Sequence, residues 1–131
     1  MSEDACVSCK VVLLGESGVG KTAIINRFMN DVFDEGGIST TGASYTDKIM
    51  QFPEFGKSLK FEIWDTAGQE KYRALTKIFY KDAAIAILVY DITNKKSFDE
   101  MKDYWYQQVF NTSPKNIGMI YIIFSLCRCC Q

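Results

Sequence analysis

Residues 15–22, GESGVGKT, combine glycines, a lysine and a hydroxyl at a spacing suited to holding phosphate. They fit the pattern G-x-x-x-x-G-K-[ST], in which the glycines let backbone N–H groups turn toward an anion. A helix that starts here would add the positive end of its dipole. Lys21 would reach the β- and γ-phosphates of a nucleotide, and Thr22 would bind Mg²⁺ through its hydroxyl. A chance glycine-rich turn is the alternative, and it is disfavoured by the apolar run before the loop and the helical pattern after it.

A second group of residues, WDTAGQE at 64–70, follows an apolar segment. Asp65 stands where an acidic residue at a strand end would hold the water shell of Mg²⁺. Gly68 would let a backbone N–H approach the γ-phosphate, and Gln69 can orient an attacking water. An aspartate at a strand end is usually a turn or capping residue, so this interpretation depends on the first motif. The chain has no histidine, so other groups must supply any acid–base chemistry.

Apolar runs and helical patterns alternate along the chain and would position these residues. We expect strands over residues 10–14, 43–51, 58–64, 83–90 and 117–124, and helices over 22–29 and about 75–80. A further helix is predicted to begin at Ser97, with Glu100 at capping-box spacing, and to stop before Pro114. The link FPEFGK suits an antiparallel hairpin, and segments 31–42 and 66–73 are predicted loops. The alternation predicts an α/β sheet with right-handed crossovers.

The composition fits one domain of ordinary size, with 131 residues, 47% of them apolar and 24% charged. A net charge of −1 gives no bulk electrostatic reason to bind nucleic acid, so no nucleic-acid partner is predicted. The N-terminus lacks the order of a signal peptide, and the longest apolar run, 119–124, is too short to span a bilayer. We therefore expect a cytoplasmic protein whose five cysteines are reduced. A zinc site is disfavoured because there is no histidine and no paired CxxC.

Five segments, GESGVGKT, STTGASY, WDTAGQE, YRALTKIFY and LVYDIT, resemble the successive signature segments of Ras-superfamily small GTPases of the Rab type. The resemblance runs from about residue 10 to residue 120. It implies an α/β fold of the P-loop NTPase class, a three-layer G domain whose mostly parallel sheet has one antiparallel edge strand. It also implies a molecular switch in vesicle-mediated transport that binds GDP or GTP with Mg²⁺ and hydrolyses the γ-phosphate.

The same resemblance assigns roles to individual residues. The nucleotide-binding set is Gly15, Ser17, Gly18, Val19, Gly20, Lys21, Thr22, Phe33, Thr40 and Gly68, the Mg²⁺ set is Thr22, Thr40 and Asp65, and the catalytic residue is Gln69. Phe33 would pack against the guanine, and Thr40 would contact both Mg²⁺ and the γ-phosphate. Ser17 lies close to Gln69 in the family and is expected to slow hydrolysis only modestly. The loops that hold Thr40 and Gln69 would be the two switch loops.

The resemblance also implies partners. The phosphate-binding loop has no arginine aimed at the γ-phosphate, so a GTPase-activating protein is expected to supply one. Effectors and an exchange factor would bind at the switch loops, with Phe52 and Trp64 nearby. Rab proteins carry geranylgeranyl groups on C-terminal cysteines, so lipid attachment at Cys129 and Cys130 would place the chain on the cytosolic face of endomembranes. Reduced, unmodified thiols are the alternative.

The sequence departs from the family after the last predicted strand. The family reads guanine with N-K-x-D there and supports it with S-A-K, whereas residues 125–131 read SLCRCCQ. We divide the chain into an N-terminal extension (1–9), an incomplete G domain (10–124) that lacks its C-terminal strand and helices, and a cysteine-rich end (125–131). Without the aspartate that pairs with guanine, discrimination of GTP from ATP would weaken. A non-catalytic interaction module, or a fragment with impaired guanine specificity, is the alternative hypothesis. A P-loop ATPase would not account for STTGASY and WDTAGQE.

Overall fold

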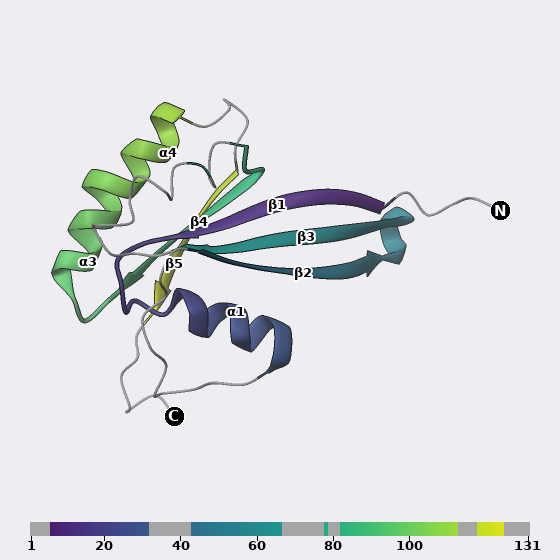
Figure 1. Ribbon diagram of the computed structural model, residues 1–131, viewed down its shortest axis with the longest axis horizontal. Helices are drawn as coiled ribbons and strands as arrows, with labels where there is room; N and C mark the ends of the chain where they lie inside the picture. The colour runs from purple at the N-terminus through teal and green to yellow at the C-terminus, as the bar shows by residue number, and fades with distance from the viewer. Residues whose placement is uncertain (1–5, 32–42, 67–77, 79–81, 113–117, 125–131) are drawn as a thin grey trace.

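The computed structural model describes residues 6–31, 43–66, 78, 82–112 and 118–124, which form a mixed sheet with helices on both faces (Figure 1). The elements in chain order are β1 (Cys6–Leu14), α1 (Lys21–Asn30), β2 (Ala43–Phe52), the 3₁₀ turn η1 (Pro53–Phe55), β3 (Lys57–Thr66), β4 (Ile85–Asp91), α3 (Lys95–Glu100), the π-helical turn η3 (Met101–Trp105), α4 (Tyr106–Thr112) and β5 (Gly118–Phe124). No helix in these ranges is long and apolar enough to cross a membrane.

The sheet has the strand order β2-β3-β1-β4-β5. Strand β1 runs parallel to β3 and to β4, and β4 runs parallel to β5, whereas β2 at the edge is antiparallel to β3. This confirms the predicted mostly parallel sheet with one antiparallel edge strand. The β2–β3 hairpin turns through η1 and closes at Gly56, whose N–H donates to the Pro53 carbonyl at 3.1 Å. Gly56 has a φ of 59°, which glycine adopts without a steric penalty.

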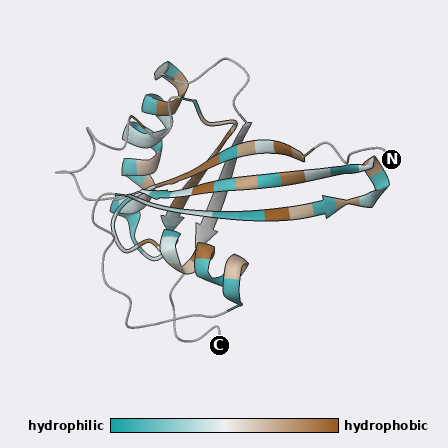
Figure 2. Cartoon of the chain, turned by 45° about the vertical axis from the view of Figure 1, so that its right-hand side comes forward, coloured by the Kyte–Doolittle hydropathy of each residue, from teal (hydrophilic) through white to brown (hydrophobic). Residues whose placement is uncertain are grey.

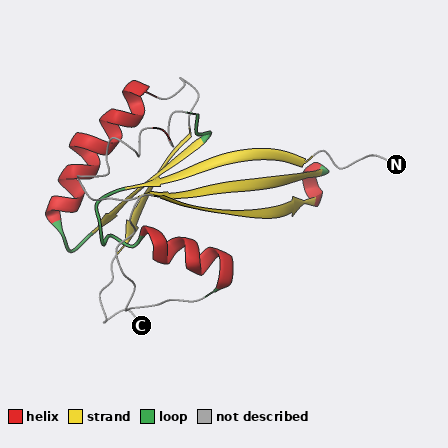
Figure 3. Cartoon of the chain, in the orientation of Figure 1, coloured by secondary structure: helices red, strands yellow, loops and turns green. Residues whose placement is uncertain are grey.

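Helices cover the two faces of the sheet and make three layers. Figure 3 shows α1 on one side of the strands and the continuous α3–η3–α4 segment on the other. Residues 11–14 of β1 are all buried because both faces of this central strand are covered. The α1 side of the core contains Val11, Leu13, Val19, Ile25, Ile63 and Val89. The α3–α4 side contains Val12, Leu14, Ala83, Ala86, Leu88, Met101, Trp105 and Val109.

Toward the hairpin end, β1, β2 and β3 extend beyond the covered part of the sheet. Figure 2 shows hydrophobic and hydrophilic residues alternating along these strands, as period-2 side-chain direction requires. On β2 the more exposed residues are Tyr45, Asp47 and Ile49, and the half-buried ones between them include Lys48 and Met50. The half-buried set faces α1, since Met50 and Phe52 line an apolar pocket of about 400 Å³ between α1 and the sheet.

Several predicted boundaries were wrong by two residues or more, including the end of β3, which is Thr66, and the start of β4, which is Ile85. Strand β1 begins at Cys6, four residues before its predicted start, because residues 6–9 pair in parallel with residues 58–61 of β3. The helix after β4 begins at Lys95 rather than at Ser97. Its cap is Asn94, whose side-chain oxygen accepts the Ser97 N–H at 3.4 Å. The Ser97 hydroxyl instead accepts the Asp91 N–H at 3.0 Å and lies 2.7 Å from the Asn94 carbonyl oxygen.

The other predicted elements agree in type with the structure. Helix α1 covers the predicted 22–29, and β2, β3, β4 and β5 correspond to the four later predicted strands. Helix α4 ends at Thr112, two residues before Pro114. The predicted helix over 75–80, apart from Ile78, and the two loops beyond Asp31 and Thr66 lie outside the described residues.

Candidate functional site

The phosphate-binding loop connects the buried end of β1 to the first turn of α1. Strand β1 ends at Leu14 and α1 begins at Lys21, so the loop is formed by residues 15–20. Gly20 is the residue before the helix and has a φ of 107°. It has no side chain to cap the first turn, so the N–H groups of that turn are arranged to meet an anion. The sequence therefore places a helix N-terminus at the carboxyl ends of parallel strands.

Two glycines of the loop are required for different physical reasons. A Cβ added to Gly15 would lie 2.2 Å from the Val89 carbonyl oxygen of β4, so only glycine fits this close approach. Gly18 has open space around it but a φ of 79°, a conformation that L side chains rarely adopt. Val19 is buried in the core, so only its backbone could contact phosphate. Ser17 is exposed.

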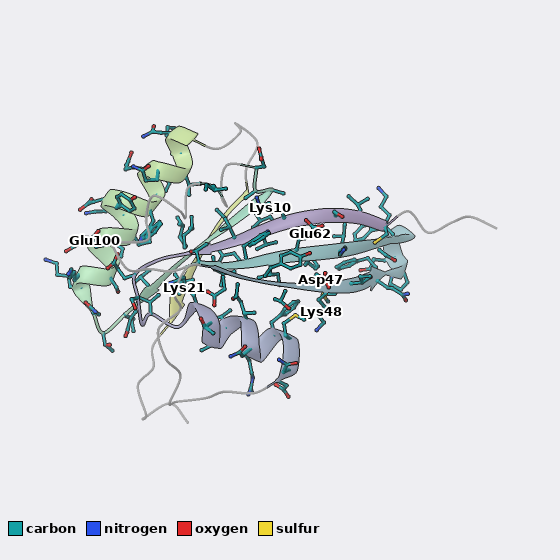
Figure 4. The ribbon with its side chains drawn as sticks, in the orientation of Figure 1. Lys10, Lys21, Asp47, Lys48, Glu62 and Glu100 are labelled. Atoms are coloured by element: carbon teal, nitrogen blue, oxygen red, sulfur yellow. The ribbon has the colours of Figure 1, made fainter. Side chains whose placement is uncertain are left out.

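Lys21 is the central cation of the site. Its side chain is only 6% exposed and points back into the loop, where Nζ donates to the Gly15 carbonyl at 2.9 Å and to the Glu16 carbonyl at 2.7 Å (Figure 4). Burial lowers the pKa of the Lys21 ammonium from 10.5 to about 8, and the carboxylates of Asp65 and Glu16 oppose that shift. The lysine is thus a buried, positioned cation at the centre of a loop shaped for phosphate.

Thr22 and Asp65 meet beside this lysine. The Thr22 hydroxyl donates to Asp65 Oδ2 at 2.5 Å, although the two residues are 43 positions apart in the chain. Asp65 is 3% exposed and lies opposite Leu13 in the last pair of the β1–β3 ladder. Parallel pairing of β1 with β3 therefore brings the second sequence motif to the first.

The Thr22–Asp65 pair fits Mg²⁺. This ion prefers oxygen ligands, and a hydroxyl oxygen and a carboxylate oxygen meet here. Among the described residues, no cluster of three or more acidic, cysteine or histidine side chains could hold a metal. A magnesium ion here would be held through these two residues and the predicted ligand Thr40, together with phosphate and water.

Several predicted site residues lie outside the part of the chain that the structure describes. They are Phe33, Thr40, Gly68 and Gln69, together with the cysteines Cys129 and Cys130. One residue that the sequence analysis did not single out is Thr66, the last residue of β3, whose side chain is fully buried. Its hydroxyl donates to the Leu13 carbonyl at 2.6 Å. The sequence feature that could have indicated a role for Thr66 is its position directly after Asp65 in WDTAGQE.

Phe52 and Trp64, predicted to lie near one surface, are on opposite faces of the sheet. Phe52 lines the apolar pocket on the α1 side. Trp64 packs against the core on the α3–α4 side and contacts Tyr45 with ring centroids 4.8 Å apart. The reason is register, because Tyr45 pairs with Trp64 and Phe52 pairs with Lys57. Tyr45 and Trp64 share the face on the α3–α4 side.

The fold and the loop define the class of the protein, a three-layer P-loop domain with a Ras-like sheet. The model of the Ras family matches residues 10–124. The chain is 45% identical to Ras-related protein Rab-22A of Homo sapiens over 108 residues, which are 82% of this chain and 54% of that protein. It is 48% identical to Ras-related protein Rab-8B of Bos taurus over 95 residues, which are 72% of this chain and 45% of that protein.

The chain therefore belongs to the Ras family and is of the Rab type, as its sequence motifs predicted. It spans about half the length of the curated relatives that it matches.

Proposed function

We propose that the chain is a Rab-like small GTPase that binds GDP and GTP with Mg²⁺ and hydrolyses GTP as a switch in vesicle-mediated transport. The observation that carries the proposal is the meeting of buried Lys21 with the Thr22–Asp65 pair at the N-terminus of α1. Lys21 has carbonyl partners that fix its ammonium group within the loop. Membership of the Ras family supports the choice of a guanine nucleotide.

The loop would bind the phosphates before any chemistry occurs. Backbone N–H groups of the loop and of the first turn of α1 would donate to phosphate oxygens, while Lys21 supplies positive charge. Thr22 and Asp65, with Thr40 from the first switch loop, would hold Mg²⁺, which when bound neutralises charge on the β- and γ-phosphates. Because Lys21 is buried, its interaction with phosphate would be weakly screened by solvent.

Hydrolysis would depend on the second switch loop. Gln69 would orient the water that attacks the γ-phosphate, and the backbone N–H of Gly68 would contact that phosphate. A site without an arginine aimed at the γ-phosphate hydrolyses slowly by itself, so a GTPase-activating protein would supply one. An exchange factor would release GDP, and the switch loops would be ordered by the γ-phosphate.

Effector binding is proposed for the sheet face that carries Tyr45 and Trp64, which are close in sequence to the two predicted switch loops. Tyr45 is 45% exposed and contacts Trp64 with the two ring planes tilted by 54°, and the Lys10 ammonium lies 5.8 Å from the centre of the Trp64 ring. Exposed aromatic residues with a neighbouring cation are typical of protein interfaces. We further propose a cytoplasmic location, with association at endomembranes if Cys129 and Cys130 carry prenyl groups.

A second candidate function is a non-catalytic interaction module. The observation that favours it is the sequence SLCRCCQ after β5, where the family has N-K-x-D. Such a module would keep the Tyr45–Trp64 face without hydrolysing nucleotide.

Single-turnover GTP hydrolysis separates the two candidates. The GTPase proposal expects slow release of phosphate in Mg²⁺, with a rate that falls at least tenfold in Gln69→Leu, because the attacking water loses its orienting group. Release at the buffer rate in both proteins, at any protein concentration, would reject the enzyme and favour the interaction module.

A further inference from the structure

Thr66 is the last residue of β3 and contacts β1 just before the phosphate-binding loop, without being one of the predicted ligands. It is fully buried, and its hydroxyl donates to the Leu13 carbonyl at 2.6 Å, across 53 positions of sequence. Its neighbour Asp65 forms the last pair of the β1–β3 ladder, with Leu13. The Thr66 hydroxyl therefore links the end of β3 to Leu13 of β1, two positions before Gly15.

These contacts close a ring around the loop. From Leu13 the backbone runs through residues 15–20 to Thr22, whose hydroxyl donates to Asp65. Thr66 follows Asp65 in the chain, and its hydroxyl donates to the Leu13 carbonyl, which completes the ring. The hydrogen bond from Thr66 to Leu13 thus adds to the β1–β3 ladder in fixing the position of Asp65 relative to the loop that leads to Thr22.

We propose that Thr66 is a positioning residue for the magnesium site, which holds the Asp65 carboxylate at the Thr22 hydroxyl through its bond to the Leu13 carbonyl. The inference rests on the proposed function, since it concerns Mg²⁺ bound with nucleotide. Mg²⁺ demands near-ideal octahedral geometry, so a small drift of Asp65 would lower its affinity. Residues that orient metal ligands typically contribute 10- to 100-fold to metal affinity.

A merely structural role would give a different result. If Thr66 only stabilised the fold, its loss would weaken GDP binding equally with and without Mg²⁺. A positioning role confines the loss to the Mg²⁺-dependent part of binding. The informative quantity is therefore the ratio of the GDP affinity in MgCl₂ to the GDP affinity in EDTA.

The test measures this ratio by calorimetry for the whole chain and its Thr66→Val, Thr66→Ser and Ser97→Ala variants. Thr66→Val keeps the shape and removes the hydroxyl, and we expect its ratio to fall about tenfold while its affinity in EDTA stays within about twofold. Thr66→Ser keeps the hydroxyl and should restore the ratio. Ser97→Ala removes a buried hydroxyl far along the chain and should leave the ratio unchanged.

An unchanged ratio in Thr66→Val, or equal losses in both buffers, would overturn the inference. If Thr66→Val does not fold, Thr66→Ala is measured in its place. A lowered ratio would again support the inference, and an unchanged ratio or equal losses in both buffers would overturn it.

A second measurement needs no ligand and separates this inference from the proposed function. If the unmodified chain binds no GDP in either buffer, the proposed function fails. The positioning role is then decided by the urea unfolding midpoints of Thr22→Val, Asp65→Ala and the double variant. Each is measured in the chain that has Thr66 and again in the Thr66→Val background. We expect the two substitutions to be non-additive with Thr66 present and additive in Thr66→Val. Equal non-additivity in both backgrounds would contradict the positioning role.

Discussion

At the scale of single residues, Lys21 has the most distinctive environment among the described residues. A lysine with a side chain only 6% exposed is held by two carbonyl oxygens and faces the Asp65 and Glu16 carboxylates. Buried lysines are rare because the charged form loses hydration. The unfavourable desolvation of the Lys21 ammonium occurs at the point where a polyanionic ligand would bind, and the attraction between the two would offset it.

The depressed pKa of Lys21 predicts a pH dependence of stability. Its pKa is about 8 in the fold against 10.5 in the unfolded chain, so between these values the unfolded state binds more protons. The free energy of unfolding of the nucleotide-free chain should therefore rise from pH 8 to pH 10, with an upper limit of roughly 3 kcal/mol from this group. Urea unfolding at both pH values measures it. Lys21→Met is the control, and an equal pH dependence in that variant would contradict the assignment.

Gly15 and Gly18 should respond differently to the same substitution. In Gly15→Ala the new Cβ meets the Val89 carbonyl oxygen at 2.2 Å, a clash that involves backbone on both sides. We expect a loss of about 2–3 kcal/mol of unfolding free energy. Gly18→Ala has space and should cost only about 1 kcal/mol, for its positive φ. Urea unfolding curves measure the free energy of unfolding of both variants. Equal losses of that free energy in the two variants would refute the packing role of Gly15.

The residue scale also marks the limit of prediction from sequence. Motif spacing led to the prediction that Thr22 and Asp65 act together, and the structure places their side chains in contact. Their roles toward Mg²⁺ stay predictions. The packing reason for Gly15 could not be predicted, because Val89 is distant in sequence and reaches the loop only through the pairing of β1 with β4. The hydrogen bond from the Thr66 hydroxyl to the Leu13 carbonyl could not be predicted for the same reason, since it also depends on strand pairing between distant segments.

At the scale of elements, apolar runs predicted the strands well and their ends poorly. Strand β1 starts at Cys6 because the long β3 supplies a partner for residues 6–9, and that partner, residues 58–61, is distant in the sequence. The start of α3 was misplaced because Asn94 and Ser97 are both good capping residues three positions apart. The structure uses Asn94 as the cap and buries Ser97. Which face of the hairpin holds Phe52 or Trp64 depends on register, which no local pattern fixed.

The capping role of Asn94 is directly testable. Asn94→Ala removes the side-chain oxygen that accepts the Ser97 N–H, and should lower the free energy of unfolding by about 1 kcal/mol. Asn94→Asp keeps an acceptor in place and should be nearly neutral. Thermal unfolding followed by circular dichroism compares the three proteins. If Asn94→Ala proved as stable as the unmodified chain, Asn94 would not be the effective cap.

At the scale of the whole molecule, the two faces of the sheet differ. The α3–α4 side buries Trp105 and Val109 completely. On the α1 side, the pocket of about 400 Å³ is lined by Val11, Leu13, Ile24, Ile25, Phe28, Met50, Phe52, Phe61, Ile63, Ile85 and Ile87. All of these side chains are apolar, and Phe28 at the surface is 41% exposed. Apolar surface of this kind interacts with hydrophobic molecules.

The apolar pocket predicts binding of a hydrophobic dye by the folded chain. Addition of 8-anilinonaphthalene-1-sulfonate should give enhanced, blue-shifted fluorescence that is lost in the cooperative unfolding transition. Phe28→Glu places a charge among the lining residues and should reduce the signal severalfold, whereas Phe110→Glu, exposed on α4, should not. Fluorescence equal to that of free dye would mean that this pocket is closed in solution.

The central claim is that the Lys21 loop binds the phosphates of a guanine nucleotide. Calorimetric titration of residues 1–131 with GDP and then ADP, in Mg²⁺, tests it most directly, with Lys21→Ala beside the unmodified chain. We expect GDP binding that weakens at least 100-fold in Lys21→Ala, because the buried cation is lost from the phosphate site. Stronger binding of GDP than of ADP would establish guanine selectivity. No binding of GDP, or equal binding by both proteins, would contradict the account.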